Sequence, residues 1–306
     1  MSVSVATCPA AAAVLLMVAA LLGGCGADAT PEHAYLGMTP PGRTPEIFAA
    51  GIISEAGYRL HGAPTFAPDH TEVCWPVIPP AIMRSVYRDG AWSEPEDMPL
   101  DVAGAQAPSF SPDGSRLYLQ GARSDGYGSL DIWYLPRGDD GWGAPVNIGP
   151  PVNSESMESQ PCITAGQALY FTGSLEGVGF DRGIYRARPA IEGHAEPELL
   201  EGSINTEFID YCPFVAPDES YLLFASSRPG LKEELFLFVT FQGADGSWSE
   251  PRKIHEAISF PAPARFPSVS PDGRYLFFLS GGEIYWVDFA PVLELGVDAW
   301  VVEFSE

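Results

Sequence analysis

The sequence has few basic residues, few cysteines and few histidines. Its 306 residues include 16 Lys and Arg against 40 Asp and Glu, so the formal net charge is −24. This balance excludes a general nucleic-acid binder, because phosphate contacts need a basic surface, and it disfavours electrostatic docking onto anionic lipid. Apolar residues make up 46% of the chain, which is enough for a packed core and excludes a fully disordered protein.

Signatures of several enzyme and metal-site classes are absent as well. The sequence contains no Gly-x-Ser-x-Gly, no His-Glu-x-x-His, no P-loop and no EF-hand loop. The five histidines are scattered along the chain, at His33, His61, His70, His194 and His255. We therefore expect neither a cofactor nor a metal ion.

The first residues have the pattern of a targeting signal. Residues 1–24 carry no charge, and residues 10–22 are an apolar run of 13 residues, which is short for a spanning helix of about 20 residues but typical of a signal-peptide core. The run leads into Leu22-Gly23-Gly24-Cys25, which resembles the lipobox of bacterial lipoproteins. This resemblance implies removal of residues 1–24 and lipidation of Cys25; an unlipidated secreted protein and an uncleaved anchor are the alternatives.

The segment after Cys25 is rich in Pro, Ala, Thr and Gly. This composition predicts a flexible tether over residues 25–44. Gly26 stands where an Asp would signal inner-membrane retention in enterobacterial lipoproteins, so the resemblance favours an outer-membrane location, facing the periplasm or the cell surface.

The rest of the chain is repetitive. One pattern returns five times: Pro, two residues, a small residue, Pro-Asp or a degenerate form of it, and an apolar run. The leading prolines are Pro64, Pro108, Pro161, Pro213 and Pro267. In the second copy the turn residues Pro112-Asp113-Gly114 separate two short apolar stretches, which predicts a hairpin.

Two more strands are expected in each repeat. One is apolar, as at residues 131–134, and the other contains Trp-x-x-Pro, as at residues 142–145. Four short strands in roughly 50 residues describe a β-propeller blade, and such blades must close into a ring to bury both faces. We predict an all-β propeller of four-stranded blades over residues 45–290.

The two ends of this region complement each other. Residues 45–50 resemble a fourth strand with no blade ahead of them, and the last repeat lacks a fourth strand. We therefore predict five blades, with an N-terminal strand completing the last blade; six blades, with one degenerate copy, are the alternative. Residues 291–306 are expected to form a C-terminal extension or an extra strand.

The Ser-Pro-Asp-Gly hairpins, the Asp-Ile-Trp strand and the Trp-x-x-Pro segment resemble the WD40-like (PD40) repeats of TolB-type propellers, which occur in periplasmic and outer-membrane lipoproteins of Gram-negative bacteria. The resemblance covers residues 45–290. It implies a propeller fold and, in most such domains, binding of proteins or cell-envelope components without chemistry.

Candidate site residues stand just before the leading prolines. His61, Glu158 and Asp210 precede a proline by three residues, and Arg265 precedes one by two. Because innermost strands line a propeller's channel, we expect these four side chains to meet at one mouth and to bind a ligand there. Glu158 and Asp210 would be the catalytic pair if the protein were a glycoside hydrolase; otherwise they cap strand ends, bind water or hold a cation.

Three cysteines remain once Cys8 leaves with the signal and Cys25 carries the lipid. Cys162 and Cys212 are expected on neighbouring inner strands, where a disulfide would need a Cα separation of about 4.4–6.8 Å. The alternative is that they, like Cys74, are buried free thiols.

The sequence thus predicts a non-catalytic cell-envelope lipoprotein. Its propeller would bind an envelope protein or polysaccharide while the lipid on Cys25 holds it at the membrane. The alternatives are a carbohydrate-active propeller enzyme and a propeller that binds a small ligand or cation. Nothing in the sequence indicates an oligomeric state.

Overall fold

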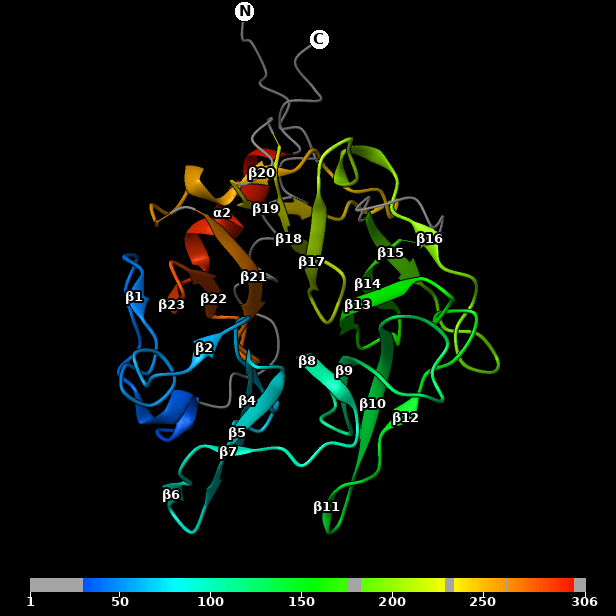
Figure 1. Cartoon of the computed structure of the whole chain (residues 1–306). Helices are drawn as coiled ribbons and strands as arrows, with labels where there is room; N and C mark the ends of the chain where they lie inside the picture. Colours follow the sequence, from blue (N-terminus) through cyan, green and yellow to red (C-terminus); the bar gives the residue numbers. More distant parts are fainter. Residues whose placement is uncertain (1–29, 175–182, 229–233, 262, 300–306) are drawn as a thin grey trace, which may run out of the picture.

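The computed structural model describes residues 30–174, 183–228, 234–261 and 263–299. In this part of the chain the strands form five antiparallel sheets. Figure 1 shows these sheets arranged around a central axis, following one another in sequence order. The fold is a five-bladed β-propeller, as the five repeats predict, and the six-bladed alternative is wrong.

Each sequence repeat forms one blade, with its leading proline at the innermost strand. Blade 1 contains β2 (Arg59–Leu60), β3 (Thr65–Phe66), β4 (Glu72–Ile78), β5 (Ala81–Arg88), β6 (Ala91–Trp92) and β7 (Glu96–Asp97), and blade 2 contains β8 (Ala103–Phe110), β9 (Arg116–Ala122), β10 (Asp131–Gly138), β11 (Gly141–Trp142) and β12 (Val146–Asn147). Blade 3 contains β13 (Met157–Ile163), β14 (Leu169–Ser174), β15 (Gly183–Ala187) and β16 (Glu198–Leu199); blade 4 contains β17 (Asp210–Val215), β18 (Tyr221–Ser226), β19 (Phe236–Phe241) and β20 (Arg252–Lys253); blade 5 contains β21 (Ala264–Val269), β22 (Tyr275–Ser280), β23 (Glu283–Asp288) and β1 (Glu46–Ile47).

The hairpin between the two inner strands takes its shape from the Ser-Pro-Asp-Gly sequence. In blade 2 the Asp113 carboxylate accepts hydrogen bonds from the Ser111 hydroxyl at 2.6 Å and from the Ser115 amide at 3.0 Å. Gly114 has a φ of 69°, a left-handed conformation that glycine adopts without steric cost. The turn is therefore determined by local chemistry, which explains why it could be predicted.

The ring is closed by pairing between the two ends of the chain. In blade 5, Glu46 lies opposite Trp286 and Ile47 lies opposite Tyr285 in the antiparallel pair of β1 and β23. The first strand therefore completes the last blade, as predicted from the unmatched fourth strand at the N-terminus.

Residues 30–44 do not form the flexible tether that their composition predicts. The 3-10 turn η1 (Ala34–Gly37) is buried, and Tyr35 is only 2% exposed. The Tyr35 ring centroid lies 5.5 Å from that of Phe66 in blade 1 and 5.3 Å from that of Tyr275 in blade 5. The prediction fails because this aromatic side chain buries itself in the seam between the first and last blades.

Hydrogen bonds hold the same segment to both of these blades. The Trp92 indole in blade 1 donates to the His33 carbonyl at 2.8 Å, and the Asp288 amide in blade 5 donates to the Gly42 carbonyl at 3.0 Å. We call residues 30–44 the strap. It is a second closure of the ring, in addition to the pairing of β1 with β23.

The chain after the last blade is helical. Residues Ala290–Ala299 form the helix α2, so the extra strand considered for residues 291–306 is wrong over this range. Pro291 stands in the first turn, where its missing N–H costs nothing. Val292 and Leu295, three residues apart, are buried in the apolar cluster of blades 4 and 5.

The predicted signal peptide and Cys25 lie outside the described residues, as do residues 300–306. Within the described ranges, no helix combines the length and the apolar character needed to cross a bilayer.

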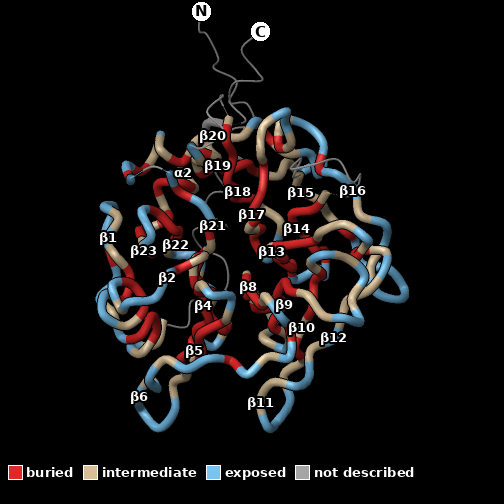
Figure 2. Tube along the Cα trace, in the orientation of Figure 1, coloured by how far each residue is buried: buried red, intermediate tan, exposed pale blue. Residues whose placement is uncertain are grey.

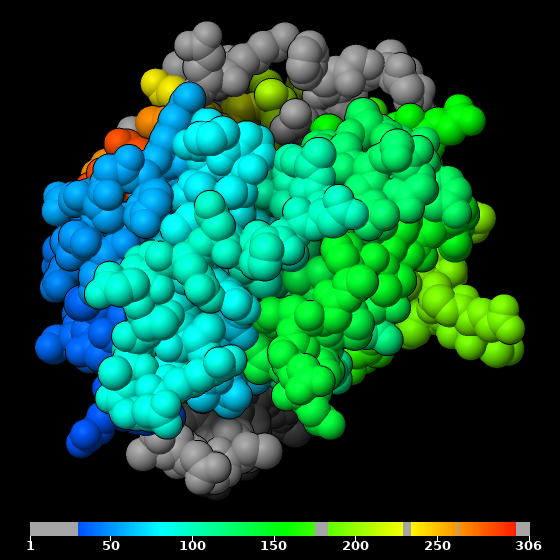
Figure 3. All heavy atoms as spheres, turned by 60° about the horizontal axis from the view of Figure 1, so that its bottom comes forward, coloured from blue at the N-terminus to red at the C-terminus, as the bar shows by residue number. Residues whose placement is uncertain are grey.

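Apolar contacts between neighbouring blades form much of the core. Leu237 of blade 4 and Leu276 of blade 5 belong to one buried cluster, and Trp75 of blade 1, Phe277 of blade 5 and Tyr35 of the strap belong to another. Figure 2 shows burial concentrated on the strands and exposure on the outer loops. Figure 3, with the lower side of Figure 1 turned forward, shows blade 1 in cyan packed directly against blade 2 in green. The ring as a whole is therefore the stable unit.

Candidate functional site in the central channel

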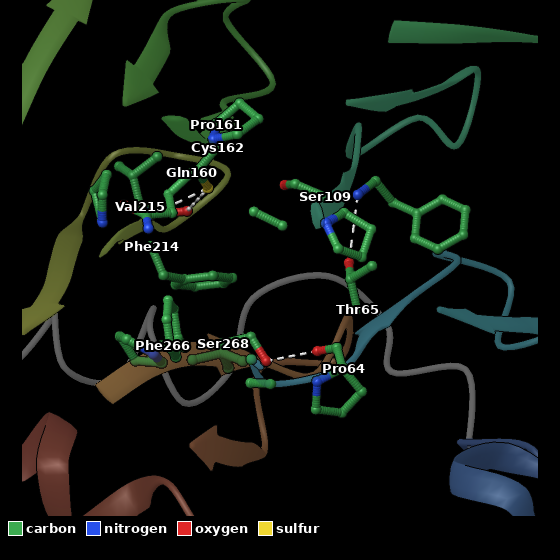
Figure 4. A pocket seen from close by; sticks show the side chains of 18 of the residues that line it. Pro64, Thr65, Ser109, Gln160, Pro161, Cys162, Phe214, Val215, Phe266 and Ser268 are labelled. Carbon is green, nitrogen blue, oxygen red and sulfur yellow. Dashed lines mark hydrogen bonds between the residues drawn. The ribbon is translucent and has the colours of Figure 1, made fainter. Parts of the chain in front are cut away.

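The innermost strands of all five blades enclose a cavity of about 780 Å³ along the central axis. Each blade contributes its leading proline to the lining: Pro64, Pro108, Pro161, Pro213 and Pro267. The hairpin turns contribute a second set of prolines, Pro68, Pro112, Pro217 and Pro271. Figure 4 shows Phe214 and Phe266 among the lining side chains as well, so the wall is largely apolar.

The residue before the leading proline has a left-handed backbone conformation in four of the blades. The φ angles are 50° at Ala107, 51° at Gln160, 55° at Cys212 and 54° at Phe266. In each case the strand register shifts at this point, which is a β-bulge. Non-glycine residues in this region cost on the order of 1 kcal/mol or more. These repeated bulges direct the residue before each proline toward the channel.

The cavity is uncharged although the chain is strongly acidic. Among the described residues, its lining contains no Asp, Glu, Lys or Arg. Its polar groups are amides and hydroxyls, including Gln106, Gln120, Gln160, Thr65, Ser109 and Ser268. A charged group entering the cavity would lose its hydration without a compensating ion pair, so the cavity suits the uncharged part of a ligand.

Several of these polar groups are already used to join neighbouring blades. The Ser268 hydroxyl donates to the Pro64 carbonyl at 2.7 Å, and the Phe110 amide donates to the Thr65 hydroxyl at 3.3 Å (Figure 4). The backbone amide of Gln160 donates a hydrogen bond to the side-chain carbonyl of Gln120 at 3.0 Å. These bonds join blade 5 to blade 1, blade 1 to blade 2 and blade 2 to blade 3 beside the channel.

One buried polar atom of the described lining has no hydrogen-bond partner. The side-chain oxygen Oε1 of Gln160 is buried and has no hydrogen-bond partner among the described residues. A buried acceptor without a partner costs about 1–3 kcal/mol, so Gln160 is a strained point of the lining in this conformation of its side chain.

Of the four residues predicted at the mouth, only His61 lines this cavity; the two cysteines considered for a disulfide, Cys162 and Cys212, line it as well. The His61 ring centroid lies 5.4 Å from that of Phe266. Burial lowers the pKa of His61, and the nearby positive charges of Arg265 and Arg59 lower it further. Both effects favour the neutral form of the imidazole.

Glu158 does not face the cavity. It is fully buried, and its carboxylate accepts hydrogen bonds from the Ser154 amide at 3.1 Å and from the Ser154 hydroxyl at 2.6 Å. Burial raises the pKa of Glu158 above its ordinary value, although the two hydrogen bonds oppose this effect. The side chain fixes the loop that enters its own blade.

Asp210 likewise fixes the loop that enters blade 4. It is fully buried, and it accepts hydrogen bonds from the Thr206 amide and hydroxyl, each at 2.7 Å. Arg228 forms an ion pair with it at 2.6 Å. Glu158 and Asp210 thus act in separate loops as strand-end caps, one of the roles considered for them in the sequence.

Arg265 is exposed at one mouth of the channel rather than in its lining. Its guanidinium lies 5.3 Å from the Phe266 ring, and it shares a surface pocket with Arg59 of blade 1. Of the four predicted mouth residues, the structure brings His61 and Arg265 together around Phe266. It places Glu158 and Asp210 elsewhere.

The disulfide considered for Cys162 and Cys212 is not formed. Both side chains are buried thiols, as is that of Cys74. The Cys162 sulfur instead accepts a hydrogen bond from the Val215 amide at 3.4 Å, so it contacts the backbone of the next blade. Burial raises the pKa of Cys162 to about 11, which makes the thiol unreactive at neutral pH.

Sequence reasoning missed the residues that do face the channel. It placed the site two or three residues before the prolines, at the entry ends of the inner strands. The bulge brings the residue directly before the proline into the lining in blades 2 to 5. The proline was the available signal, since it marks the strand position where regular pairing stops. Arg59 was missed because β2 is a two-residue strand outside the repeat.

The described residues contain no group of three His, Cys, Asp or Glu side chains placed to bind a metal ion. The lining of the channel is largely apolar, and the carboxylates of Glu158 and Asp210 hold loops outside it.

No protein-family profile and no curated protein matches the sequence. Among solved structures, TolB from Acinetobacter baumannii is 15% identical, with a TM-score of 0.47, and the match covers 75% of this chain and 54% of that chain. A gluconolactonase from Xanthomonas campestris is 11% identical, with a TM-score of 0.47 and coverage of 82% and 97%. An oligogalacturonate lyase from Vibrio parahaemolyticus is 16% identical, with a TM-score of 0.41 and coverage of 76% and 66%.

The chain thus spans about half the length of the TolB chain. The propeller is established by this chain's own sheets. Its function has to be argued from its own channel.

Proposed function

We propose that this protein is a non-catalytic, lipid-anchored component of the cell envelope that binds a segment of a partner protein in its central channel. The observation that carries the proposal is the pairing of a cavity of about 780 Å³ with a described lining that has no charged side chain. Cavities of this size with apolar walls and a few polar groups are typical binding sites.

The chemistry of the wall favours a peptide. Proline and aromatic surfaces, such as Pro161, Phe214 and Phe266, pack well against extended peptide segments. The polar groups of the lining are amides and hydroxyls, which can pair with a peptide N–H or carbonyl. An uncharged, extended stretch of a partner would therefore lose little hydration on entering.

The arrangement of carboxylates weighs against a carbohydrate-active enzyme. Glycosidases need two carboxyl groups flanking the bond that is cleaved. Glu158 and Asp210 each hold a loop by at least two hydrogen bonds, and neither belongs to the lining of the cavity. This supports binding rather than catalysis.

Filling the channel tests the proposal. Ala107→Phe gives blade 2 the residue that blade 5 already has at the equivalent left-handed position, Phe266, so the backbone conformation tolerates it. Ala190→Phe, at an exposed position of blade 3, is the matched control. Each variant would be expressed as the full chain, crosslinked in native membranes and purified, with Cys25→Ala as the control for anchoring.

We expect Ala107→Phe to reduce capture of one specific envelope protein by about tenfold or more, equivalent to about 1.4 kcal/mol, and Ala190→Phe to have no effect. Equal capture by both variants would contradict a channel site. Capture of a polysaccharide would assign the channel to an envelope polymer instead, and glycan turnover that Glu158→Gln abolishes would identify an enzyme.

A further inference from the structure

Two arginines at one mouth of the channel form no ion pair with any carboxylate in the described part of the chain. Arg59 lies on β2 of blade 1 and Arg265 on β21 of blade 5. Both line a surface pocket of about 570 Å³ at the seam between the first and last blades. Elsewhere most described arginines are paired, as Arg84 is with Glu96 at 2.8 Å and Arg228 is with Asp210 at 2.6 Å.

Two carboxylates are also present in this pocket. Glu55 and Glu283 also line it. The Glu283 carboxylate accepts a hydrogen bond from the Glu55 backbone amide at 3.0 Å, and among the described residues neither glutamate forms an ion pair with Arg59 or Arg265. The two guanidinium groups therefore keep their donors available.

The arginines belong to the same mouth as the channel wall. Arg265 lies 5.3 Å from the Phe266 ring, and the His61 ring lies 5.4 Å from it. Phe266 and His61 line the cavity. Arg59 and Arg265 also both act electrostatically on His61. Arg265 therefore contacts the rim of the channel wall directly, and Arg59 lies near enough to His61 to act on its charge.

Charge makes this arrangement unusual in the chain. A protein with 40 acidic and 16 basic residues has ample carboxylates with which to pair each arginine, yet two arginines meet here beside a histidine. Like charges at one site repel each other, and an anion between them removes the repulsion. The planar donors of arginine match a carboxylate in a bidentate geometry.

We infer that Arg59 and Arg265 bind a carboxylate group of the ligand whose uncharged part occupies the channel. The inference rests on the proposed channel function and adds the chemistry of its ligand. Two sources supply that group in a partner peptide: the C-terminus of the chain, or the side chain of an Asp or Glu next to the apolar segment.

The test compares matched small probes on the purified full chain in detergent. 4-Phenylbutyrate and its neutral amide, 4-phenylbutanamide, share an aromatic body that fits the apolar wall and differ only in the charged group. Binding would be measured by ligand-observed NMR and calorimetry for the unchanged protein, for the double variant Arg59→Gln/Arg265→Gln, and for Arg88→Gln. Arg88 is an exposed arginine at the end of β5 that lines neither pocket.

Three capped peptides distinguish the two sources of the carboxylate. The first, N-acetyl-Ala-Pro-Phe, has a free C-terminus; the second is its C-terminal amide; the third is N-acetyl-Ala-Pro-Phe-Asp amide, which carries the carboxylate on a side chain. Preference for the first peptide indicates recognition of a chain end, and preference for the third indicates recognition of an acidic side chain.

We expect 4-phenylbutyrate to bind about tenfold more tightly than the amide, as hydrogen bonds to a charged group typically contribute. The preference should vanish in the double arginine variant and persist in Arg88→Gln. If neither carboxylate probes nor acidic peptides show an arginine-dependent preference, the inference is overturned. If the acid and the amide bind equally and Ala107→Phe abolishes the binding of both, the channel binds ligands but the arginines do not contribute. If Ala107→Phe abolishes the binding of neither probe, both the channel function and the arginine site are contradicted.

Discussion

The Thr30 hydroxyl donates a hydrogen bond of 2.7 Å to the carboxylate of Asp272, which lies 242 positions later in the sequence. The same carboxylate accepts the Ser270 hydroxyl at 2.6 Å within its own turn. An aspartate that the repeat explains as a turn residue thus also holds the strap. The segment that resembles a linker is part of the folded ring.

The strap should make a large contribution to the stability of the ring. A chain beginning at residue 30 is expected to unfold at the same urea concentration as the mature protein, and a chain beginning at residue 45 at a much lower one. Tyr35→Ala should cost about 3–5 kcal/mol, the usual loss for a buried aromatic side chain. Urea unfolding followed by circular dichroism measures these differences.

Tyr58 provides the control for this substitution, because it is 37% exposed and lies outside the strap. Tyr58→Ala should change the free energy of unfolding by less than about 0.5 kcal/mol. If the chain beginning at residue 45 is as stable as the longer one, residues 30–44 do not act as a strap in solution.

Acid should weaken the closure through Asp272. Burial alone would raise the pKa of this carboxyl, but hydrogen bonds from Ser270 and Thr30 outweigh burial and hold the pKa below its ordinary value. A group whose pKa is lower in the folded state contributes stability above its unfolded pKa of about 3.9, and this stability is lost as the pH falls through the folded value.

We therefore expect the free energy of unfolding to decrease below about pH 4, and to decrease less steeply in Asp272→Asn. Asp218→Asn, which alters the same turn in a blade that the strap does not reach, is the control. Urea titrations at a series of pH values would test this, and identical slopes for the unchanged protein and Asp272→Asn would contradict it.

The two buried carboxylates should matter for folding and not for ligand binding. Asp210→Asn leaves Arg228 largely buried without its ionic partner, so we expect a loss of about 3 kcal/mol or more. Glu158→Gln keeps an acceptor for Ser154 and should cost about 1 kcal/mol or less. Thermal unfolding and partner capture would be measured on the same preparations. Loss of capture by Glu158→Gln with unchanged stability would show that Glu158 has a functional role.

The three thiols should not react with thiol reagents in the native protein. The thiols of Cys74, Cys162 and Cys212 are buried, and thiols react as thiolates. We expect a thiol reagent such as dithionitrobenzoate to label none of the three at pH 8 and all of them in guanidinium chloride, with no effect of reductant on stability. A reductant-sensitive melting temperature would instead indicate a disulfide.

The sequence predicted the ring because the information for it is local and repeated. Each Ser-Pro-Asp-Gly turn forms its own hydrogen bonds, as Asp113 does with Ser111 and Ser115. The unmatched strand at residues 45–50 predicted the closure because a blade shared between the two ends leaves an extra strand at one end of the repeats and a missing strand at the other.

The strap and the channel lining could not be predicted in the same way. Composition marked residues 25–44 as a linker, yet the burial of Tyr35 depends on a surface that exists only after blades 1 and 5 meet. The residues facing the channel depend on a left-handed bulge, as at Gln160 with a φ of 51°, and such a bulge shifts the strand's alternation by one position. The burial of the strap and the choice of residues that face the channel are both determined by tertiary structure rather than by local propensity.

The closure of the ring also fixes an order of events during folding. Ile47 pairs with Tyr285, Thr30 with Asp272, and Arg43 with Glu294 at 3.3 Å, so the first described residues find their partners only when nearly the whole chain is available. Contacts this distant in sequence form slowly. Until they form, the first and last blades present unpaired strand edges, which are prone to association with other chains. The protein therefore completes its fold only after synthesis, and the interval before closure is when it most needs protection from aggregation.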